Sequence, residues 1–487
     1  MICFHRRALL KTTIIFLIII TAVGCSKPAS DTPTPTPTQT PTPAPIVSDV
    51  AFWLTKADQS VLLQKQGESL VFSNSVNQNA TIVVDTTQTY QNIDGFGFAL
   101  TGGSAYLIDR LTAADQTALL KELFTTDSTF IGVNYLRVSM GASDLSSSVF
   151  SYDDVSNNMP DTSLSYFDLA ADKYDLIPVL KQIVALQPNI KIIATPWSAP
   201  VWMKTVNSSV GGNLKTDYYN VYAKYFVKYI QAMKAQGIRI DAVTPQNEPL
   251  NAYNNPSMLM SATEQLNFVK NYLGPQFVAA GIDTKIILYD HNCDVPSYPI
   301  TILNDVDVRK YVDGSAFHLY SGNISALSDV HNAYPDKNVY FTEQWVGAPS
   351  NFSGDLNWHV KNLIVGATRN WSKNVIEWNL ASDPSYSPHT NGGCTTCLGA
   401  LTIGSSITRN VSYYIIAHAS KFVPQGSVRI ASNITSSLQN VAFKTPAGKK
   451  VLIVLNDNAS TQTFNIQFNN KIVTSSLTAG AVATYIW

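Results

Sequence analysis

The chain has 487 residues, of which 45% are hydrophobic and 14% charged, and its formal net charge at pH 7 is −1. This composition excludes a disordered chain, and it argues against nucleic acid or another polyanion as a partner, because such partners bind to basic surfaces. The length is sufficient for a barrel of roughly 250 to 300 residues and a smaller second domain.

The first 25 residues predict an export signal. Arg6 and Arg7 precede an apolar stretch over residues 13–22 that is too short to span a bilayer comfortably. The Ala-Val-Gly sequence before Cys25 resembles the cleavage site of bacterial lipoproteins, in which the cysteine becomes the lipidated N-terminus. We therefore expect residues 1–25 to be a lipoprotein signal peptide with Cys25 as the lipidation site. An ordinary signal peptide is the alternative.

Residues 26–47 contain a Thr-Pro repeat that predicts an extended spacer, because alternating prolines prevent helix and sheet formation. Such a spacer would hold the folded part away from a membrane, and unstructured filler is the alternative. Ser26 is not the aspartate that favours inner-membrane retention in enteric bacteria. We therefore expect an exported, lipid-anchored protein at the outer membrane or cell surface of a bacterium.

Strand-like patterns at both ends of the folded part predict a β-sandwich. The candidate strands are residues 52–54, 62–63, 80–85, 428–430, 441–443, 450–455, 462–466 and 481–487. Turn-forming pairs such as Ala447-Gly448 separate several of them. We expect residues 48–90 and 420–487 to form one antiparallel β-sandwich beside the main domain.

Residues 91–419 alternate between strand and helix patterns. The candidate strands are residues 135–138, 191–194, 242–243, 285–289, 314–318, 339–341 and 375–378, and the candidate helices are residues 113–124, 176–186, 217–236, 262–273 and 357–368. Roughly eight strand–helix units favour a (β/α)8 TIM barrel over a doubly wound sheet. Gly95-Phe-Gly97 does not continue as a dinucleotide-binding loop, so no cofactor is expected.

Two glutamates follow apolar, strand-like stretches. Glu248 lies in Thr-Pro-Gln-Asn-Glu-Pro (residues 244–249) and Glu343 in Phe-Thr-Glu-Gln-Trp (residues 341–345). Active sites of barrels are assembled at the C-terminal ends of the strands, and cleavage of a glycosidic bond requires two carboxyl groups. A single glutamate at a strand end is more often a salt-bridge partner. The two matching motifs together predict that Glu248 and Glu343 are the catalytic pair of a glycosidase.

Other strand ends carry polar and aromatic candidates for sugar binding, which are Arg137, Trp197, Asn247, His318, Tyr320, Trp345 and Trp378. The Asn247 amide can bind a sugar hydroxyl, while Arg137 and Tyr320 can keep a neighbouring carboxylate ionised. Tryptophans can form walls for the sugar ring. Each candidate also has a structural alternative: an ion pair for Arg137, a hydrogen-bonded barrel histidine for His318, and the core for any single tryptophan.

Asp144, Asp153 and Asp154 are interpreted as loop or cap residues and are assigned no catalysis. Glycosidase chemistry requires an acid with a raised pKa and a nucleophile with a low pKa. A retaining mechanism would place the two carboxyl groups about 5 to 5.5 Å apart.

Six ordered motifs resemble glycoside hydrolase family 30. They are Asp94-Gly-Phe-Gly-Phe-Ala-Leu-Thr101, Leu136-Arg-Val-Ser139 with Ser151-Tyr-Asp-Asp154, Ala194-Thr-Pro-Trp-Ser-Ala-Pro-Val-Trp-Met-Lys-Thr205, Thr244-Pro-Gln-Asn-Glu-Pro249, His318-Leu-Tyr320 and Phe341-Thr-Glu343. The resemblance implies a (β/α)8 barrel with a side β-sandwich and a retaining double displacement, with Glu248 as acid/base and Glu343 as nucleophile. It also implies that the first glycone subsite is surrounded by Arg137, Trp197, Asn247, Tyr320 and Trp378.

The family that these motifs resemble includes glucosylceramidases, endo-β-1,6-glucanases and some β-xylosidases and xylanases. Glucosylceramidases carry an aspartate shortly after the Gly-Phe-Gly segment, where this chain has Gly102, so a strict lysosomal-type glucosylceramidase is disfavoured. We expect a monomeric endo-β-1,6-glucanase that acts on β-glucan, with a lipid anchor to a membrane and no nucleic-acid partner. The alternatives are an exo-acting β-glucosidase, β-xylosidase or glucosylceramidase, and a non-catalytic glycan-binding lipoprotein.

Three cysteines remain after the expected signal peptide and lipidation site. Cys394 and Cys397 lie in Gly-Gly-Cys-Thr-Thr-Cys-Leu-Gly, a loop after the last barrel strand, and in an oxidising compartment they most simply form a local disulfide. Zinc is the alternative, but two further ligands are not visible nearby, so no metal is expected. Cys293 is expected to be buried and free.

Overall fold

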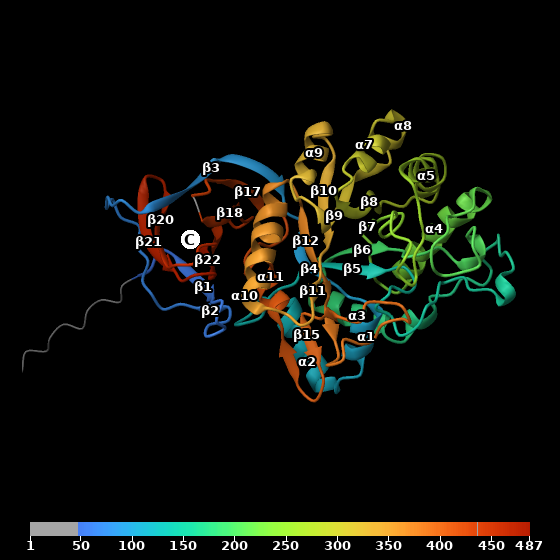
Figure 1. The fold of residues 1–487 in the computed structure, drawn as a ribbon, viewed down its shortest axis with the longest axis horizontal. Helices are drawn as coiled ribbons and strands as arrows, with labels where there is room; N and C mark the ends of the chain where they lie inside the picture. Colours follow the sequence, from blue (N-terminus) through green and yellow to red (C-terminus); the bar gives the residue numbers. More distant parts are fainter. Residues whose placement is uncertain (1–46, 436) are drawn as a thin grey trace, which may run out of the picture. The chain divides into compact units, whose positions relative to one another are not determined.

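The computed structural model describes residues 47–435 and 437–487, and residues 47–487 form one compact unit (Figure 1). The expected signal peptide, the lipidation site Cys25 and all but the last residue of the expected linker lie outside the described residues. Within the described part of the chain, no helix is both long and apolar enough to cross a membrane.

Eight parallel strands of the described chain form the barrel that the sequence predicts. They are β4 (Gly95–Ala99), β5 (Tyr135–Ser139), β6 (Lys191–Thr195), β7 (Ala242–Val243), β8 (Lys285–Cys293), β9 (Val312–Gly322), β10 (Asn338–Glu343) and β12 (Asn374–Asn379). Strands β4 to β10 pair in this order and β12 pairs with β4, so the sheet is nearly closed, with β10 and β12 at its edges. Seven of the strands each contribute one side chain to an apolar cluster, which contains Tyr135, Ile193, Ala242, Ile287, Ala316, Tyr340 and Ile376. The predicted (β/α)8 fold is confirmed.

Strand β4 is absent from the sequence-based expectations, because glycine is depleted in strands. Its glycines are required by the close approach of β5. A Cβ atom on Gly97 would lie 1.8 Å from the carbonyl oxygen of Tyr135. The Gly-Phe-Gly motif therefore marks a fully buried strand, which no larger residue at position 97 would fit.

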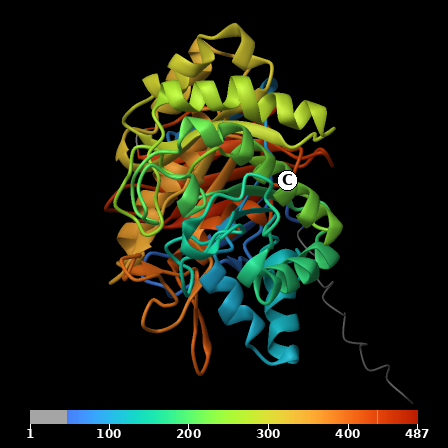
Figure 2. The same ribbon diagram turned by 90° about the vertical axis from the view of Figure 1, so that its right-hand side faces the viewer.

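The barrel helices lie outside the strands (Figures 1 and 2). The helices of the described chain are α1 (Gly102–Asp109), α2 (Ala113–Phe124), α3 (Leu176–Leu186), α4 (Tyr219–Ala235), α5 (Ala262–Phe268), α6 (Gly274–Ala279), α7 (Ser297–Leu303), α8 (Val306–Arg309), α9 (Ala326–Ala333), α10 (Phe352–His359) and α11 (Val411–Ser420). The two predicted helices at 262–273 and 357–368 each contain a π-helical stretch, at Val269–Leu273 and Val360–Ala367.

Strands from both ends of the described chain form the second β-structure, as predicted. They are β1 (Ala51–Thr55), β2 (Gln64–Lys65), β3 (Ala80–Asn92), β17 (Val428–Ser432), β18 (Leu438–Lys444), β19 (Lys450–Asn456), β20 (Gln462–Phe468), β21 (Lys471–Leu477) and β22 (Val482–Ile486). Neighbouring strands are antiparallel except β3 and β20, which run parallel. Residues 62–63 precede β2 and form no strand, and β21 was not predicted. Two small sheets contain β11 (Val346–Gly347), β13 (Ala381–Ser382), β14 (Cys397–Leu398), β15 (Leu401–Ile403) and β16 (Ile407–Arg409).

Directed hydrogen bonds join the barrel to the sandwich. Arg369, which follows the second π-helical stretch, donates to the carbonyl oxygens of Asn440 at 2.6 Å and Ser432 at 2.7 Å. The ring of His418 on α11 lies between the hydroxyls of Thr484 at 2.9 Å and Thr55 at 2.8 Å. These contacts connect the last barrel helix to strands from both ends of the chain.

We expect Gly97→Ala to destabilise the protein by about 3 kcal/mol or more, because the added methyl group overlaps the Tyr135 carbonyl and a packed core relaxes only partly. Gly67→Ala is the matched control, because no atom lies within 4 Å of its added Cβ, and its effect is expected to stay within about 0.5 kcal/mol. Urea unfolding measures both free energies. Equal values for the two variants would contradict the close packing of β4 on β5.

Candidate active site

The predicted site residues meet at the C-terminal ends of the barrel strands, around a pocket of about 480 Å³. The pocket lining includes Trp197, Glu248, Tyr320, Glu343, Trp345 and Trp378. The remaining three predicted residues contact one another or the lining glutamates: Arg137 binds Glu343 and Asn247, and His318 binds Glu248. All nine predicted residues therefore belong to one connected site.

The two glutamates lie close together and are almost fully buried. Glu248 is 7% exposed and Glu343 is 5% exposed. One oxygen from each carboxylate, together with a ring nitrogen of His318, lies within 4.8 Å of the other two atoms. Both carboxyl groups can therefore act on the same bond of a molecule in the pocket.

Arg137 is fully buried and holds three side chains at once. Its Nη1 donates to Glu343 Oε2 at 2.5 Å, and its Nη2 donates to Asn247 Oδ1 at 2.7 Å and to Asp290 Oδ2 at 2.9 Å. The guanidinium also lies 4.8 Å from the ring centre of Trp197. The rigid fork of arginine thus fixes the positions of a glutamate and an amide around the pocket.

Asp290 is the residue that sequence reasoning missed most clearly. It lies on β8, is fully buried, and accepts hydrogen bonds from the hydroxyls of Thr244 at 2.7 Å and Thr342 at 2.6 Å, besides Arg137. Although burial raises its pKa, the charge of Arg137 and the hydrogen bond with His318 hold the pKa well below its usual range. Its signal in the sequence is the acidic residue directly after the predicted strand 285–289.

His318 lies between the carboxylates. Its Nε2 is 3.1 Å from Asp290 Oδ1, and its Nδ1 is 3.3 Å from Glu248 Oε1 and 3.7 Å from Glu343 Oε1. Burial lowers its pKa, but the charge of Glu343 and the bonds to Asp290 and Glu248 outweigh burial and raise the pKa to about 9. At neutral pH the ring is therefore a second buried cation.

The pKa directions of the two glutamates in the free site are the reverse of the expected order. Burial raises the pKa of Glu343 against the charges of His318 and Arg137. Burial also raises the pKa of Glu248, but the bonds from His318 and Asn251 outweigh it, and the net pKa is lowered.

The loop after Glu248 is held in place by Asn251, which was not predicted. Its Nδ2 donates to Glu248 Oε2 at 2.7 Å, and its Oδ1 accepts the backbone N–H of Tyr253 at 3.0 Å. Glu248 itself has a φ of 43°, a left-handed conformation that is uncommon for a residue other than glycine. The surrounding bonds therefore fix a strained backbone at one of the two carboxylates.

Trp197 and Trp378 stack on each other, with ring centres 5.3 Å apart and planes inclined by 28°. Together they form one continuous aromatic wall of the pocket. Trp345 lies against the same cluster and is only partly buried.

Asp144 lies in a loop, as the sequence suggested, and its side chain lines the pocket. Burial and the nearby charge of Glu343 raise its pKa to about 7. The loop that carries Asp144 packs over Gly102, where an added Cβ would lie 2.8 Å from Ser146 Oγ. A carboxyl group is therefore present in the pocket, although Gly102 itself cannot supply one.

Cys394 and Cys397 form a disulfide beside the pocket, and Cys293 is buried and free. The disulfide leaves no thiolate for the zinc alternative. In the described residues, Glu248, His318 and Glu343 form the cluster whose ligand atoms are close enough for a metal ion. A cation there would compete with Arg137 for Glu343 and would require His318 to lose its proton, so the site favours hydrogen bonding over metal binding.

The barrel with a buried carboxylate pair at its strand ends defines a glycoside hydrolase. The family model described as the glycosyl hydrolase family 30 TIM-barrel domain matches residues 93–423, and the glycosyl hydrolase family 30 beta sandwich domain matches residues 426–485. The chain belongs to glycoside hydrolase family 30.

Relatives with assigned names include two kinds of enzyme. Endo-1,6-β-D-glucanase neg1 of Aspergillus fumigatus is 38% identical over 407 residues, which cover 77% of this chain and 81% of the relative. Lysosomal acid glucosylceramidase of Mus musculus is 28% identical over 443 residues, which cover 85% of each chain. Among solved structures, the endo-β1,6-glucanase BT3312 is similar with a TM-score of 0.85 and 37% identity, over 91% of this chain and 99% of that chain.

We expect His318 to keep its second proton up to about pH 9, while His418, whose pKa burial lowers to about 3, stays neutral. The pKa of His318 is higher in the folded than in the unfolded state. Its stabilising contribution is therefore complete below about pH 6.5 and is lost as the pH rises through 9. NMR titration of 13C-labelled histidine rings measures both groups, and a His318 pKa at or below about 6.5 would contradict the ionic network.

Proposed function

We propose that this protein is a retaining endo-β-1,6-glucanase, with Glu343 as the nucleophile and Glu248 as the acid/base. The observation that carries this proposal is the separation of the two buried carboxylates, whose oxygens approach within 4.8 Å in one pocket. Retaining enzymes hold their carboxyl groups about 5 to 5.5 Å apart, whereas inverting enzymes need about 6.5 to 9.5 Å to admit a water molecule.

In the first step, a Glu343 oxygen attacks the anomeric carbon while Glu248 gives its proton to the glycosidic oxygen. The aglycone leaves as an alcohol and a glycosyl ester forms on Glu343. In the second step, the ionised Glu248 takes a proton from water, whose oxygen attacks the anomeric carbon and releases the Glu343 carboxylate. Two inversions restore the β configuration.

A double displacement requires the proton shared by the two glutamates to be on Glu248, and the hydrogen-bond donors around Glu343 favour this placement. Glu343 accepts from Arg137 at 2.5 Å and from the Tyr320 hydroxyl at 2.9 Å, and arginine cannot lose its charge. Glu248 faces its charged partner His318 at 3.3 Å, a longer and weaker contact. The closer charged donor stabilises the anion on Glu343 and leaves the proton on Glu248. The two carboxyl groups are close enough to share one proton and titrate as a pair.

Two polar groups are placed to bind the sugar. Asn247 accepts from Arg137 with its Oδ1, so its Nδ2 is the end that remains to donate to a sugar hydroxyl. Asp144 lines the pocket and can accept hydrogen bonds from further hydroxyls. This carboxyl group fills the role left open at Gly102.

The choice of β-1,6-glucan rests on the names of similar proteins and on the rim of the pocket. Both similar endo-1,6-β-glucanases share more identity with this chain, 38% and 37%, than the mouse glucosylceramidase at 28%. The loop after Glu248 presents Leu250 and Tyr253, 42% and 89% exposed, to the pocket. The acid/base Glu248 lies beside the leaving group of the substrate. The apolar rim next to it can therefore bind the glucose unit on the leaving-group side of the cleaved bond.

A glucosylceramidase is the second candidate, because the same apolar rim suits a lipid aglycone and the mouse relative covers 85% of this chain. A glycan-binding protein without catalysis is disfavoured, because both carboxyl groups are present and close together.

We expect Glu343→Gln to abolish hydrolysis but spare oligosaccharide binding. Glu248→Gln should lose about 10²- to 10⁴-fold in activity on β-1,6-glucan yet still release dinitrophenolate rapidly from a dinitrophenyl β-glucoside, because this leaving group needs no proton. Stopped-flow absorbance separates the two variants. Glu68→Gln, at an exposed position outside the pocket lining, is the control. Full turnover in Glu343→Gln would exclude the assigned nucleophile.

We expect the wild-type protein to release oligosaccharides from pustulan, a β-1,6-glucan, before glucose accumulates. Tyr253→Ala should lower kcat/KM on this polymer by about tenfold, the value of one aromatic contact, and leave activity on β-glucosyl fluoride unchanged, because the fluoride leaving group does not reach the rim. Tyr166→Ala is the control, because Tyr166 is 66% exposed and lies outside the pocket lining. Chromatography of early products decides between the candidates: glucose alone would indicate exo action, and cleavage of glucosylceramide instead of pustulan would support the second function.

We also propose export and lipidation at Cys25, supported by the charged and apolar segments before it. When the full chain is produced in a bacterium, the wild-type protein should partition into the detergent phase of Triton X-114. Cys25→Ser should move to the aqueous phase, and Cys3→Ser, within the expected signal peptide, should behave like wild type. A Cys25→Ser protein that partitions like the wild type would contradict lipidation.

A further inference from the structure

A second pocket, of about 500 Å³, lies at the opposite end of the barrel strands from the glutamates. Asn134, which directly precedes β5, lines it, as does Asn189 before β6. Further lining residues come from the connection between α11 and β17, including Gln425, and from the turn between β18 and β19, including Lys449. The pocket therefore lies where the barrel meets the sandwich, away from the candidate active site.

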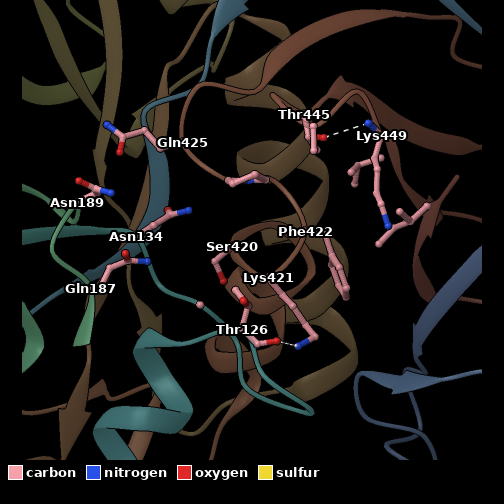
Figure 3. Close-up of a pocket in the computed structure, with 15 residues that line it drawn as sticks. Thr126, Asn134, Gln187, Asn189, Ser420, Lys421, Phe422, Gln425, Thr445 and Lys449 are labelled. Atoms are coloured by element: carbon pink, nitrogen blue, oxygen red, sulfur yellow. Dashed lines mark hydrogen bonds between the residues drawn. The ribbon is translucent and has the colours of Figure 1, made fainter. Parts of the chain in front are cut away.

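Four carboxamide side chains, those of Asn134, Gln187, Asn189 and Gln425, gather on one side of this pocket (Figure 3). Asn134 accepts the backbone N–H of Phe96 at 2.7 Å with its Oδ1, and its Nδ2 has no recorded bond to any described residue. The other three amides make no recorded side-chain hydrogen bond within residues 47–435 and 437–487. Each carboxamide can both donate and accept, so the pocket offers several unused donor and acceptor pairs.

The remaining lining consists of three hydroxyl residues, Thr126, Ser420 and Thr445, together with apolar residues and two lysines. Phe422 packs against Trp53 with ring centres 4.7 Å apart and is only 8% exposed, so little of its ring faces the pocket. The ammonium group of Lys421 is already held by three backbone carbonyls at 2.7 to 3.0 Å. None of the described lining residues is an aspartate or a glutamate.

We propose that this pocket is a second carbohydrate site, which binds a β-linked glucose oligosaccharide without cleaving it. Paired donors and acceptors of the amides match the adjacent hydroxyls of a pyranose ring. A volume of about 500 Å³ falls in the usual range for small-ligand pockets. Binding at both ends of the barrel would raise the local concentration of polymer at the active site. The identity of the glucan rests on the proposed function.

The test uses gentiotriose, a β-1,6-linked glucose trimer, and calorimetric titration of the Glu343→Gln protein. Two binding sites are expected in this background. Adding Asn189→Ala and Gln425→Ala should remove one site, with at least about a tenfold loss of its affinity. Adding Asn74→Ala and Gln78→Ala, two exposed amides outside the pocket lining, should leave both sites intact. In the otherwise wild-type enzyme, Asn189→Ala with Gln425→Ala should raise KM on pustulan about three- to tenfold and leave kcat on an aryl β-glucoside unchanged.

Cleavage by the wild-type protein is measured separately, so the two proposals fail in different ways. Binding that depends on Asn189 and Gln425 supports the second site, even if the wild-type protein cleaves no β-1,6-glucan and the proposed function falls. A single site that these substitutions do not affect overturns the second site while hydrolysis stands. Absence of any gentiotriose binding to the Glu343→Gln protein also overturns it.

Discussion

The chemistry of this barrel depends on the buried cation Arg137, which donates hydrogen bonds to three side chains on or just after strands β7, β8 and β10. At neutral pH, Arg137 and His318 supply two positive charges against the three carboxylates of Asp290, Glu248 and Glu343. A buried cluster is most stable when its charges balance, and one proton on the glutamate pair achieves this balance. A double displacement needs one proton on the pair before each cleavage. The network that stabilises the site therefore also sets the protonation state that the proposed chemistry requires.

The barrel supplies these positions through a locally strained backbone. Glu248, Tyr289 and Asp290 have φ values of 43°, 74° and 64°, in the left-handed region. Such residues cost about 1 to 3 kcal/mol each unless the surroundings hold them. Here the Glu248 N–H donates to the Asp290 carbonyl at 3.0 Å, so the strained segments support each other. The sandwich, bonded through Arg369 and His418, anchors the helices behind the strands.

Much of the fold was predictable because its signals are local. Alternating strand and helix patterns indicate the barrel, and two short motifs place glutamates at strand ends. Asp290 was missed because its role depends on a register shift between β8 and β9 near Tyr289, which sequence patterns do not reveal. Asp144 was correctly interpreted as a loop residue, but its place in the pocket was missed, because only the folded chain brings it beside Glu343 and the Cys394 backbone. Strand β4 was missed because glycine normally weakens strands.

Glu248 and Glu343 lie too close together to admit the water molecule that an inverting enzyme places between its base and the sugar. Hydrolysis should therefore retain the β configuration. Proton NMR of β-1,6-glucan hydrolysis in its first minutes observes the anomeric proton of the new reducing end before mutarotation. The β anomer should appear first and the α anomer only as the solution equilibrates. Initial formation of the α anomer would show inversion and would contradict the assignment of Glu343 as a nucleophile.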